Sequence, residues 1–268
     1  MNLRDMQTEY INEGYAPLMA AAKVCQDIIL LAIANSKLKD NVTIKGGVVM
    51  HSLSKDKRRA TQDIDFDFVH YPLSPEAITN FLRKISNEQF KIEPKGKIEQ
   101  LKHQDYQGLR VHVEITDANN NVLSSKLDIG VHTHLDITQE EYCFIIQSQD
   151  EGLLLQVNSK EQIFVEKTKS FLKHGFRSTR FKDIFDLYFL CQEAGLNNDK
   201  LKSCMQRLII EDDTMRENTF DDILARLKQT FYNRNFQRNF QSARNNWLDV
   251  SNDNAIAGII NYLEGAIL

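Results

Sequence analysis

Three aspartates alternate with large apolar residues where positions 61–68 read TQDIDFDF. Successive side chains of a β-strand point to opposite faces, so Asp63, Asp65 and Asp67 are predicted to line one face while the apolar residues face a core. Three carboxylates on one strand face repel each other and disfavour the strand. A divalent cation would offset that charge, because Mg²⁺ binds one or two carboxylates together with substrate phosphates. The alternative is an edge strand with a solvated acidic face.

A double glycine, Gly46–Gly47, lies upstream of the acidic stretch, between a predicted short strand (43–45) and a predicted short helix (48–53). Glycine lets the backbone turn tightly and approach a ligand closely. The N-terminus of a helix presents free N–H groups and partial positive charge, which suit a phosphate. By itself such a pair is usually an ordinary turn. Here it places a candidate phosphate site next to a candidate metal site.

A third carboxylate follows on a predicted hairpin. Residues 111–116 alternate apolar and polar, residues 117–121 are turn-rich, and residues 122–131 read as the returning strand. Asp128 falls on the polar face of that strand, which could lie beside the strand of Asp63. Without the other two motifs, an ordinary exposed aspartate would be the preferred interpretation.

Together these segments resemble the polymerase-β-type nucleotidyltransferase pattern and, more narrowly, the AbiEii/AbiGii (MenT-like) nucleotidyltransferase toxin family. The resemblance covers roughly residues 40–190, and the spacing from Gly47 to Asp63 is longer than is usual in the broader superfamily. It rests on Gly46–Gly47, on RATQDIDF at 59–66, on KLDI at 126–129, on EK at 166–167 and on RFKDIFDLY at 180–188.

The resemblance implies roles for individual residues. It implies that Asp63, Asp65 and Asp128 bind Mg²⁺ or Mn²⁺ and are catalytic, with Asp128 holding a second metal or accepting a proton. Lys167 and Asp183 would complete the catalytic set by reaching into the nucleotide site. The expected nucleotide-binding residues are Lys45, Gly46, Gly47, Arg59, Thr61 and Lys167.

Lys167 also has a physical argument of its own. Residues 159–174 read as a helix, and Lys167 lies on the apolar stripe of Ile163 and Phe164, so it must reach water or meet an anion. Residues 160–182 hold seven Lys or Arg and two Glu, which suits triphosphate or nucleic acid, although such runs more often mark a solvated face. Asp183 starts the next predicted helix, where a carboxylate is favoured by the helix dipole alone.

The predicted architecture is α+β. A polymerase-β-like nucleotidyltransferase core, a mixed sheet flanked by helices, occupies residues 1–158. A helical C-terminal domain that completes the nucleotide site occupies residues 159–268. In it Tyr232, Phe236 and Phe240 recur at intervals of four with arginines nearby; core packing is favoured over an RNA-binding face, since periodicity is mainly a burial signal.

Composition is typical of a cytoplasmic enzyme. The net charge of −4 over 268 residues excludes a whole-protein nucleic-acid binder, so RNA contact would need a local patch. Four cysteines show neither metal spacing nor a disulfide framework. The best apolar run, residues 28–34, is too short to span a membrane, and the charged N-terminal residues do not resemble a signal peptide.

The expected activity is Mg²⁺-dependent transfer of NMP from an NTP to a hydroxyl of RNA, possibly the 3′ end of tRNA, or of a protein. The resemblance implies the toxin of a toxin–antitoxin or phage-defence pair, with a separate antitoxin protein acting in trans. Two alternatives stay open. One is a metal-dependent phosphoesterase or nuclease that uses the same acids. The other is a non-catalytic nucleotide- or RNA-binding module of the same fold.

Overall fold

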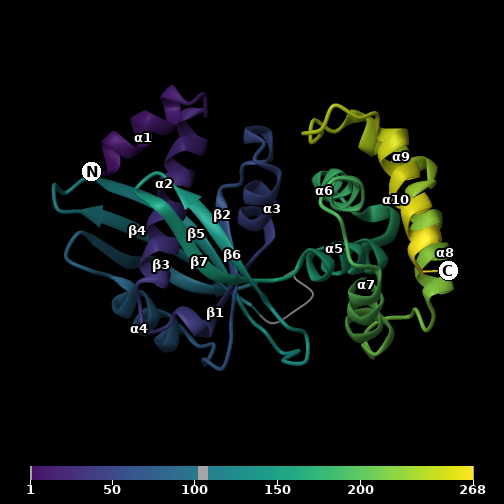
Figure 1. The fold of residues 1–268 in the computed structure, drawn as a ribbon, viewed down its shortest axis with the longest axis horizontal. Helices are drawn as coiled ribbons and strands as arrows, with labels where there is room; N and C mark the ends of the chain where they lie inside the picture. The colour runs from purple at the N-terminus through teal and green to yellow at the C-terminus, as the bar shows by residue number, and fades with distance from the viewer. Residues whose placement is uncertain (1, 102–107, 268) are drawn as a thin grey trace. The chain divides into compact units, whose positions relative to one another are not determined.

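The computed structural model describes residues 2–101 and 108–267. The chain divides into two compact units, Met1–Asn158 and Ser159–Leu268, which Figure 1 draws in purple to teal and in green to yellow. The first unit combines a sheet with helices, and the described part of the second consists of helices and their connections. The predicted α+β class, with a mixed sheet flanked by helices and a helical C-terminal region, is confirmed.

A seven-stranded mixed sheet forms the centre of the first unit, in the order β3-β4-β5-β2-β1-β7-β6. The pairs β2/β5 and β1/β7 are parallel, and the other neighbours are antiparallel. The strands are β1 (Val42–Lys45), β2 (Asp63–Phe68), β3 (Phe90–Gln100), β4 (Leu109–Asp117), β5 (Val122–Val131), β6 (Glu140–Ile146) and β7 (Gln149–Val157).

Four helices accompany the sheet: α1 (Leu3–Asn12), α2 (Pro17–Ala34), α3 (Gly46–Ser54) and α4 (Pro75–Ile85). Helix α2 packs against β5 and β7, and α4 packs against β3. By length and composition α2 could cross a membrane, and it extends well beyond the apolar run noted in the sequence. Most of its residues are buried within the unit, as in the core helix of a globular protein.

The alternation on β2 has the predicted consequence for the core. Ile64, Phe66 and Phe68 are fully buried, and the rings of both phenylalanines pack on Phe81 of α4. Ser74 caps α4 by accepting a hydrogen bond from the backbone of residue 77 at 3.1 Å. Burial of the apolar face of β2 fixes the strand, so its other face must present the aspartates.

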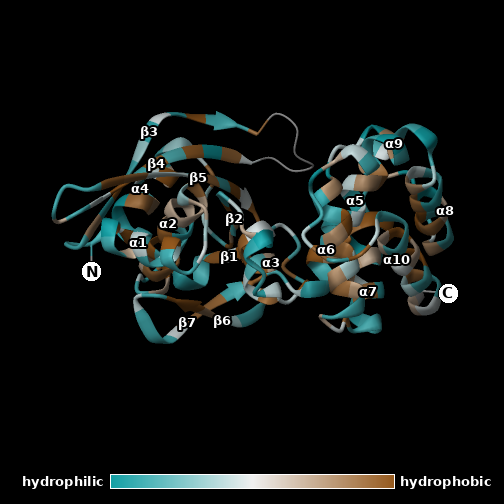
Figure 2. Cartoon of the chain, turned by 90° about the horizontal axis from the view of Figure 1, so that it is seen from above, coloured by the Kyte–Doolittle hydropathy of each residue, from teal (hydrophilic) through white to brown (hydrophobic). Residues whose placement is uncertain are grey.

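The second unit contains α5 (Lys160–His174), α6 (Phe181–Gln192), α7 (Asn198–Met205), a π-helical turn (Gln206–Ile210), α8 (Phe220–Phe231), α9 (Arg234–Ser242) and α10 (Asn252–Ile267). Figure 2 shows hydrophobic residues along its helices. Phe236 and Phe240 of α9 are buried against other rings, including Phe181 and Phe171. Tyr232 was wrongly grouped with them: it caps α8 and is 58% exposed.

Phe240 and Tyr232 therefore make a matched pair for stability. Phe240→Ala is expected to lower the free energy of unfolding by about 3–5 kcal/mol, because it removes a buried ring and leaves a cavity. Tyr232→Ala is expected to change it by less than about 0.5 kcal/mol, since most of that side chain meets water. Urea unfolding of both variants measures the difference. Equal losses would contradict the assignment of Phe240 to the core.

Candidate active site

The register of the sheet places two of the three predicted acids side by side on neighbouring strands. Strands β2 and β5 run parallel, with Asp65 paired to Asp128 and Asp63 paired to Lys126. On the other side of β2, Lys45 of β1 lies opposite Asp65. The strand of Asp128 thus lies beside that of Asp63, as expected from the sequence. Five charged side chains, from three adjacent strands, thus come together at one place in the sheet.

Cations balance these carboxylates. Arg110 of β4 binds Asp128 through two parallel hydrogen bonds of 2.7 Å, from Nε to Oδ1 and from Nη2 to Oδ2. Lys126 forms an ion pair with Asp63 at 2.7 Å, and Lys45 forms one with the third aspartate of β2, Asp67, at 2.6 Å. Arg110 is not among the site residues predicted from the sequence. The predicted hairpin could have pointed to it, because β4 is the hairpin partner of the strand that carries Asp128.

The double glycine touches Asp65. Gly46 begins α3 with φ of +65°, and a Cβ added there would lie 2.4 Å from Asp65 Oδ2. A Cβ at Gly47 would lie 2.8 Å from the side chain of Thr61. The Gly47 N–H donates a hydrogen bond to Asp65. Glycine is therefore required at both positions because a side chain would not fit, and at Gly46 also because of the backbone conformation.

The electrostatics of Asp65 reflect this crowding. Burial raises the pKa of Asp65, the neighbouring Asp128 carboxylate raises it further, and the value reaches about 6. The ammonium of Lys45 and the hydrogen bond from Gly47 oppose the rise without cancelling it. Loss of contact with water is thus the main reason that the charged form of Asp65 is disfavoured, and the neighbouring carboxylate adds to it. That is the environment a cation would relieve.

The remaining predicted nucleotide-binding residues lie on the segment before β2. Arg59 ends a short helical turn (Lys57–Arg59) and is buried. Thr61 follows two residues later, and its carbonyl oxygen accepts a hydrogen bond of 2.7 Å from Gln26 of α2. Helix α2 therefore holds the connection between the glycine turn and the acidic strand.

The donor set fits a hard divalent cation. Asp63, Asp65 and Asp128 offer carboxylate oxygens from adjacent strands, the ligands that Mg²⁺ prefers. Among the described residues, no group of three His, Cys, Asp or Glu side chains is arranged ready to hold a metal. Arg110 and Lys126 engage two of the three carboxylates, so metal binding would require these cations to release them.

A second charged cluster lies inside the helical unit. Lys167 of α5 forms ion pairs with Asp183 and, at 2.8 Å, with Asp186, both of α6. Arg180 donates to Asp183 at 2.6 Å, and the indole N–H of Trp247 donates to Asp186 at 3.0 Å. Lys167, Asp183 and Asp186 are all buried. The sequence predicted that Lys167 must reach water or meet an anion. In the structure it meets two aspartates of its own unit.

Asp183 is held in its charged form. Burial alone would raise its pKa, but the Lys167 ammonium and the Arg180 guanidinium hold it well below its usual range. In the sequence Asp183 and Asp186 both fall at the start of this helix, where the helix dipole alone favours a carboxylate, and the family resemblance implies a role only for Asp183. The spacing of three between Asp183 and Asp186, on the same helix face, was the signal that paired the two.

Asp65→Asn is expected to stabilise the metal-free protein. The folded state keeps the Asp65 proton to higher pH than the unfolded chain, so the wild type loses stability as pH rises from about 4 to about 6 and keeps this loss at higher pH. At pH 7 in EDTA the variant should gain about 1–3 kcal/mol, and the gain should vanish as pH falls to about 4. Urea unfolding across this range measures it, with Asp63→Asn as the more exposed control. A less stable Asp65→Asn at pH 7 would contradict the assignment.

Lys167→Met is expected to destabilise the helical unit. Removing the ammonium leaves Asp183 and Asp186 buried without their shared partner, which costs about 3–5 kcal/mol. Lys228→Met is the matched control, because its ion pair with Glu264 is 41% exposed on both sides and contributes at most about 1 kcal/mol. Thermal and urea unfolding measure both variants. Similar small changes in the two would show that Lys167 is not held by this cluster.

Comparison with known proteins places this geometry in a family. A solved structure, that of an antigenic nucleotidyltransferase-like protein from Paracoccidioides brasiliensis, is similar at 16% sequence identity, covering 78% of this chain and 98% of that chain with a TM-score of 0.44. No curated protein matches the chain. The model of the family described as nucleotidyl transferase AbiEii toxin, type IV toxin–antitoxin system, matches residues 28–256. The chain therefore belongs to the AbiEii nucleotidyltransferase toxin family.

Proposed function

We propose that this protein transfers NMP from an NTP to an RNA hydroxyl, with Mg²⁺ or Mn²⁺ as cofactor and the 3′ end of tRNA as the first candidate acceptor. The observation that carries the proposal is the contact of Asp65 with the Gly46–Gly47 turn on one side and its pairing with Asp128 on the other. This juxtaposes a candidate phosphate site and a candidate metal site. Family membership supports the reaction class.

The glycine turn would hold the outer phosphates of the NTP. Helix α3 begins at Gly46, so its first N–H groups are not used within the helix and carry partial positive charge. The absence of a side chain at Gly46 and Gly47 brings the Asp65 carboxylate and the Thr61 side chain close to this helix N-terminus, so a phosphate bound there would lie next to both. Arg59 and Thr61, on the segment that leads into β2, would add a charge and a hydroxyl to this binding surface.

The acids would hold the cofactor. Asp63, Asp65 and Asp128 would bind it, and when bound Mg²⁺ neutralises charge on the triphosphate during in-line displacement. Arg110 and Lys126 would then be released from the carboxylates and could face phosphate oxygens. Because Asp65 must lose its proton to bind a cation, metal affinity should rise as pH rises through about 6. Asp128 would bind a second ion or accept the proton of the attacking hydroxyl.

The helical unit would contribute through Lys167 and Asp183. We propose that Lys167 binds the triphosphate, in competition with its two aspartates, and that Asp183 orients the ammonium. Such a protein would act in the cytoplasm as the toxin of a toxin–antitoxin pair, and a separate antitoxin would oppose it.

Label transfer tests the proposed reaction. Purified protein is incubated with Mg²⁺, total tRNA and each α-³²P-labelled NTP in turn. Label on RNA is expected with the wild type and is expected to fall at least a hundredfold in Asp65→Ala and Asp128→Ala, because a metal ligand is lost. Gly46→Ala should fail similarly, since its Cβ would collide with Asp65. Asp213→Ala, an exposed aspartate of the helical unit, is the matched control that should retain activity.

Other outcomes identify the alternatives. Label on protein rather than RNA would replace the RNA acceptor with a protein hydroxyl. Cleavage of RNA without NTP, lost in Asp65→Ala, would favour a phosphoesterase. Binding of Mg²⁺–NTP without either product would favour a non-catalytic module. Expression of the wild type should arrest growth, and expression of Asp65→Ala should not.

A further inference from the structure

A basic hollow of about 410 Å³ lies within the helical unit, at the end of α5 and beside the loop that precedes α8. Four of its lining side chains are cationic, and one is acidic: Lys173, Arg177, Arg216 and Arg226 against Glu217. An adjoining hollow of about 470 Å³ shares Arg216, Glu217 and Arg226 and continues along α8. None of these residues belongs to the cluster around Lys167 or to the carboxylates of the sheet.

Two local features shape this hollow. Gly175 ends α5 with φ of +54°, which turns the chain into the short helix Gly175–Arg177 at the rim. On the opposite side, Asp212 accepts hydrogen bonds from the backbone N–H and hydroxyl of Thr214 at 2.8 and 2.6 Å, and it pairs with Lys169 at 2.5 Å. The loop that carries Arg216 is therefore anchored to α5.

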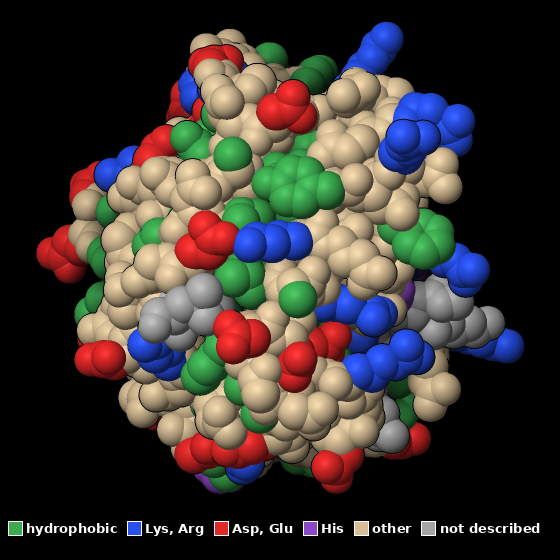
Figure 3. Space-filling model, turned by 90° about the vertical axis from the view of Figure 1, so that its right-hand side faces the viewer, with side chains coloured by type: hydrophobic (Ala, Val, Ile, Leu, Met, Phe, Trp, Pro, Cys, Tyr) green, Lys and Arg blue, Asp and Glu red, His purple; other side chains and the backbone are tan. Residues whose placement is uncertain are grey.

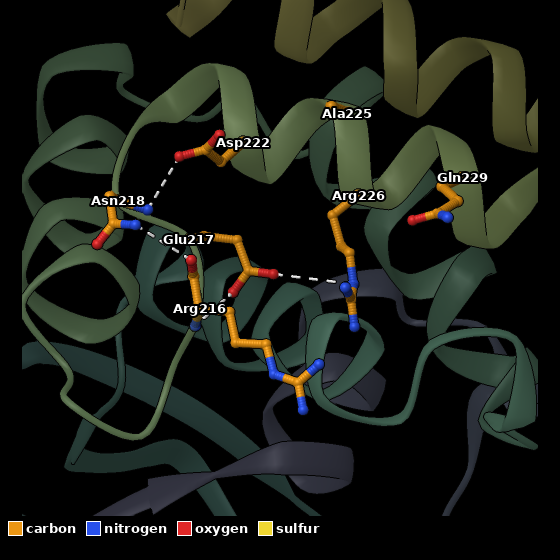
Figure 4. A pocket seen from close by; sticks show the side chains of 7 residues that line it. All are labelled: Arg216, Glu217, Asn218, Asp222, Ala225, Arg226 and Gln229. Carbon is orange, nitrogen blue, oxygen red and sulfur yellow. Dashed lines mark hydrogen bonds and ion pairs between the residues drawn. The ribbon is translucent and has the colours of Figure 1, made fainter.

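The acid in the hollow is buried and already engaged. Glu217 is 5% exposed; one oxygen accepts a hydrogen bond of 3.2 Å from the backbone N–H of Arg216, and the other lies 3.9 Å from Arg226 Nε. In Figure 4 the Arg216 side chain lies below Glu217 and the Arg226 side chain lies to its right. Glu217 thus holds the backbone at Arg216 and lies near the Arg226 guanidinium, and it is one acid against four cationic side chains in the lining.

An exposed aromatic ring stands beside these cations. Phe176 lines the hollow and is 46% exposed, and the guanidinium of Arg177 lies 5.8 Å from its ring centroid. On the face drawn in Figure 3, Lys and Arg side chains gather mainly toward the right-hand edge. Exposed rings interleaved with cations are typical of proteins that stack the bases of single strands while binding their phosphates.

We propose that this hollow binds single-stranded RNA, with phosphates held by Arg177, Arg216 and Arg226 and a base stacked on Phe176. The ring favours a single strand over a duplex, whose bases are not free to stack on a side chain. It also favours RNA over an acidic protein segment, which would use the cations and leave Phe176 exposed. That the bound strand belongs to the acceptor of nucleotidyl transfer rests on the proposed function, whereas binding itself does not.

Fluorescence anisotropy of a short labelled single-stranded RNA tests the site, using the full chain in EDTA without NTP. Arg177→Gln and Arg216→Gln should each lower the slope of log K against log salt concentration by about 0.7, because one phosphate contact is lost. Phe176→Leu should weaken binding about tenfold through loss of stacking. The matched controls Arg238→Gln and Tyr232→Leu change exposed residues that do not line the hollow and should bind as the wild type does.

Binding by Phe176→Leu and Arg216→Gln within twofold of these controls would overturn the proposal. A poly-glutamate peptide that binds as tightly as the RNA, and loses affinity in the same arginine variants but not in Phe176→Leu, would also overturn it in favour of an acidic protein partner. Failure of nucleotidyl transfer by the wild type, together with intact, Phe176-dependent RNA binding, would leave this inference standing and remove only the proposed reaction.

Discussion

The pairing of Asp65 with Asp128 across two parallel strands is the constraint on which the sheet around the site depends. Two carboxylates at adjacent register positions repel each other, and burial strengthens that repulsion because less water screens it. The fold answers with cations on the neighbouring strands: Lys45 opposite Asp65, and Arg110 bound to Asp128. The order of these strands places one cationic residue on each flank of the acidic pair. Burial and the Asp128 carboxylate together still raise the pKa of Asp65, despite the nearby Lys45.

The helical unit also pairs a buried charge with side chains of opposite charge, but here the central buried group is a cation, Lys167. Lys167 is placed on an apolar helix stripe, where an unpaired ammonium would be costly. Asp183 and Asp186 meet it from one face of α6, and Trp247 donates a hydrogen bond to an oxygen of Asp186. In the sheet, burial and the neighbouring carboxylate outweigh the nearby cation at Asp65, so the pKa of Asp65 is raised. In the helical unit, Lys167 and Arg180 outweigh burial at Asp183, so the pKa of Asp183 is lowered.

The sequence predicted those features that follow from local pattern. Alternation on β2, the glycine turn and the hairpin that carries Asp128 all depend on residues close together in the chain, and all are observed. The role of Arg110 depends on register between strands, which alternation alone does not fix. The hollow around Arg216 could not be predicted from local pattern for a similar reason, because its lining combines the end of α5 with a loop about forty residues later.

The charged side chains in this part of the sheet carry a local cost. Gly46 adopts a left-handed conformation directly against the Asp65 carboxylate, where a larger residue would collide with it. Asp65 is buried beside Asp128, and both effects raise its pKa. Backbone conformations and buried charges of this kind cost free energy, and they persist mainly at functional sites, where a bound ligand can offset the cost. This local cost is the physical basis for proposing that a cation and a phosphate bind at this place in the sheet.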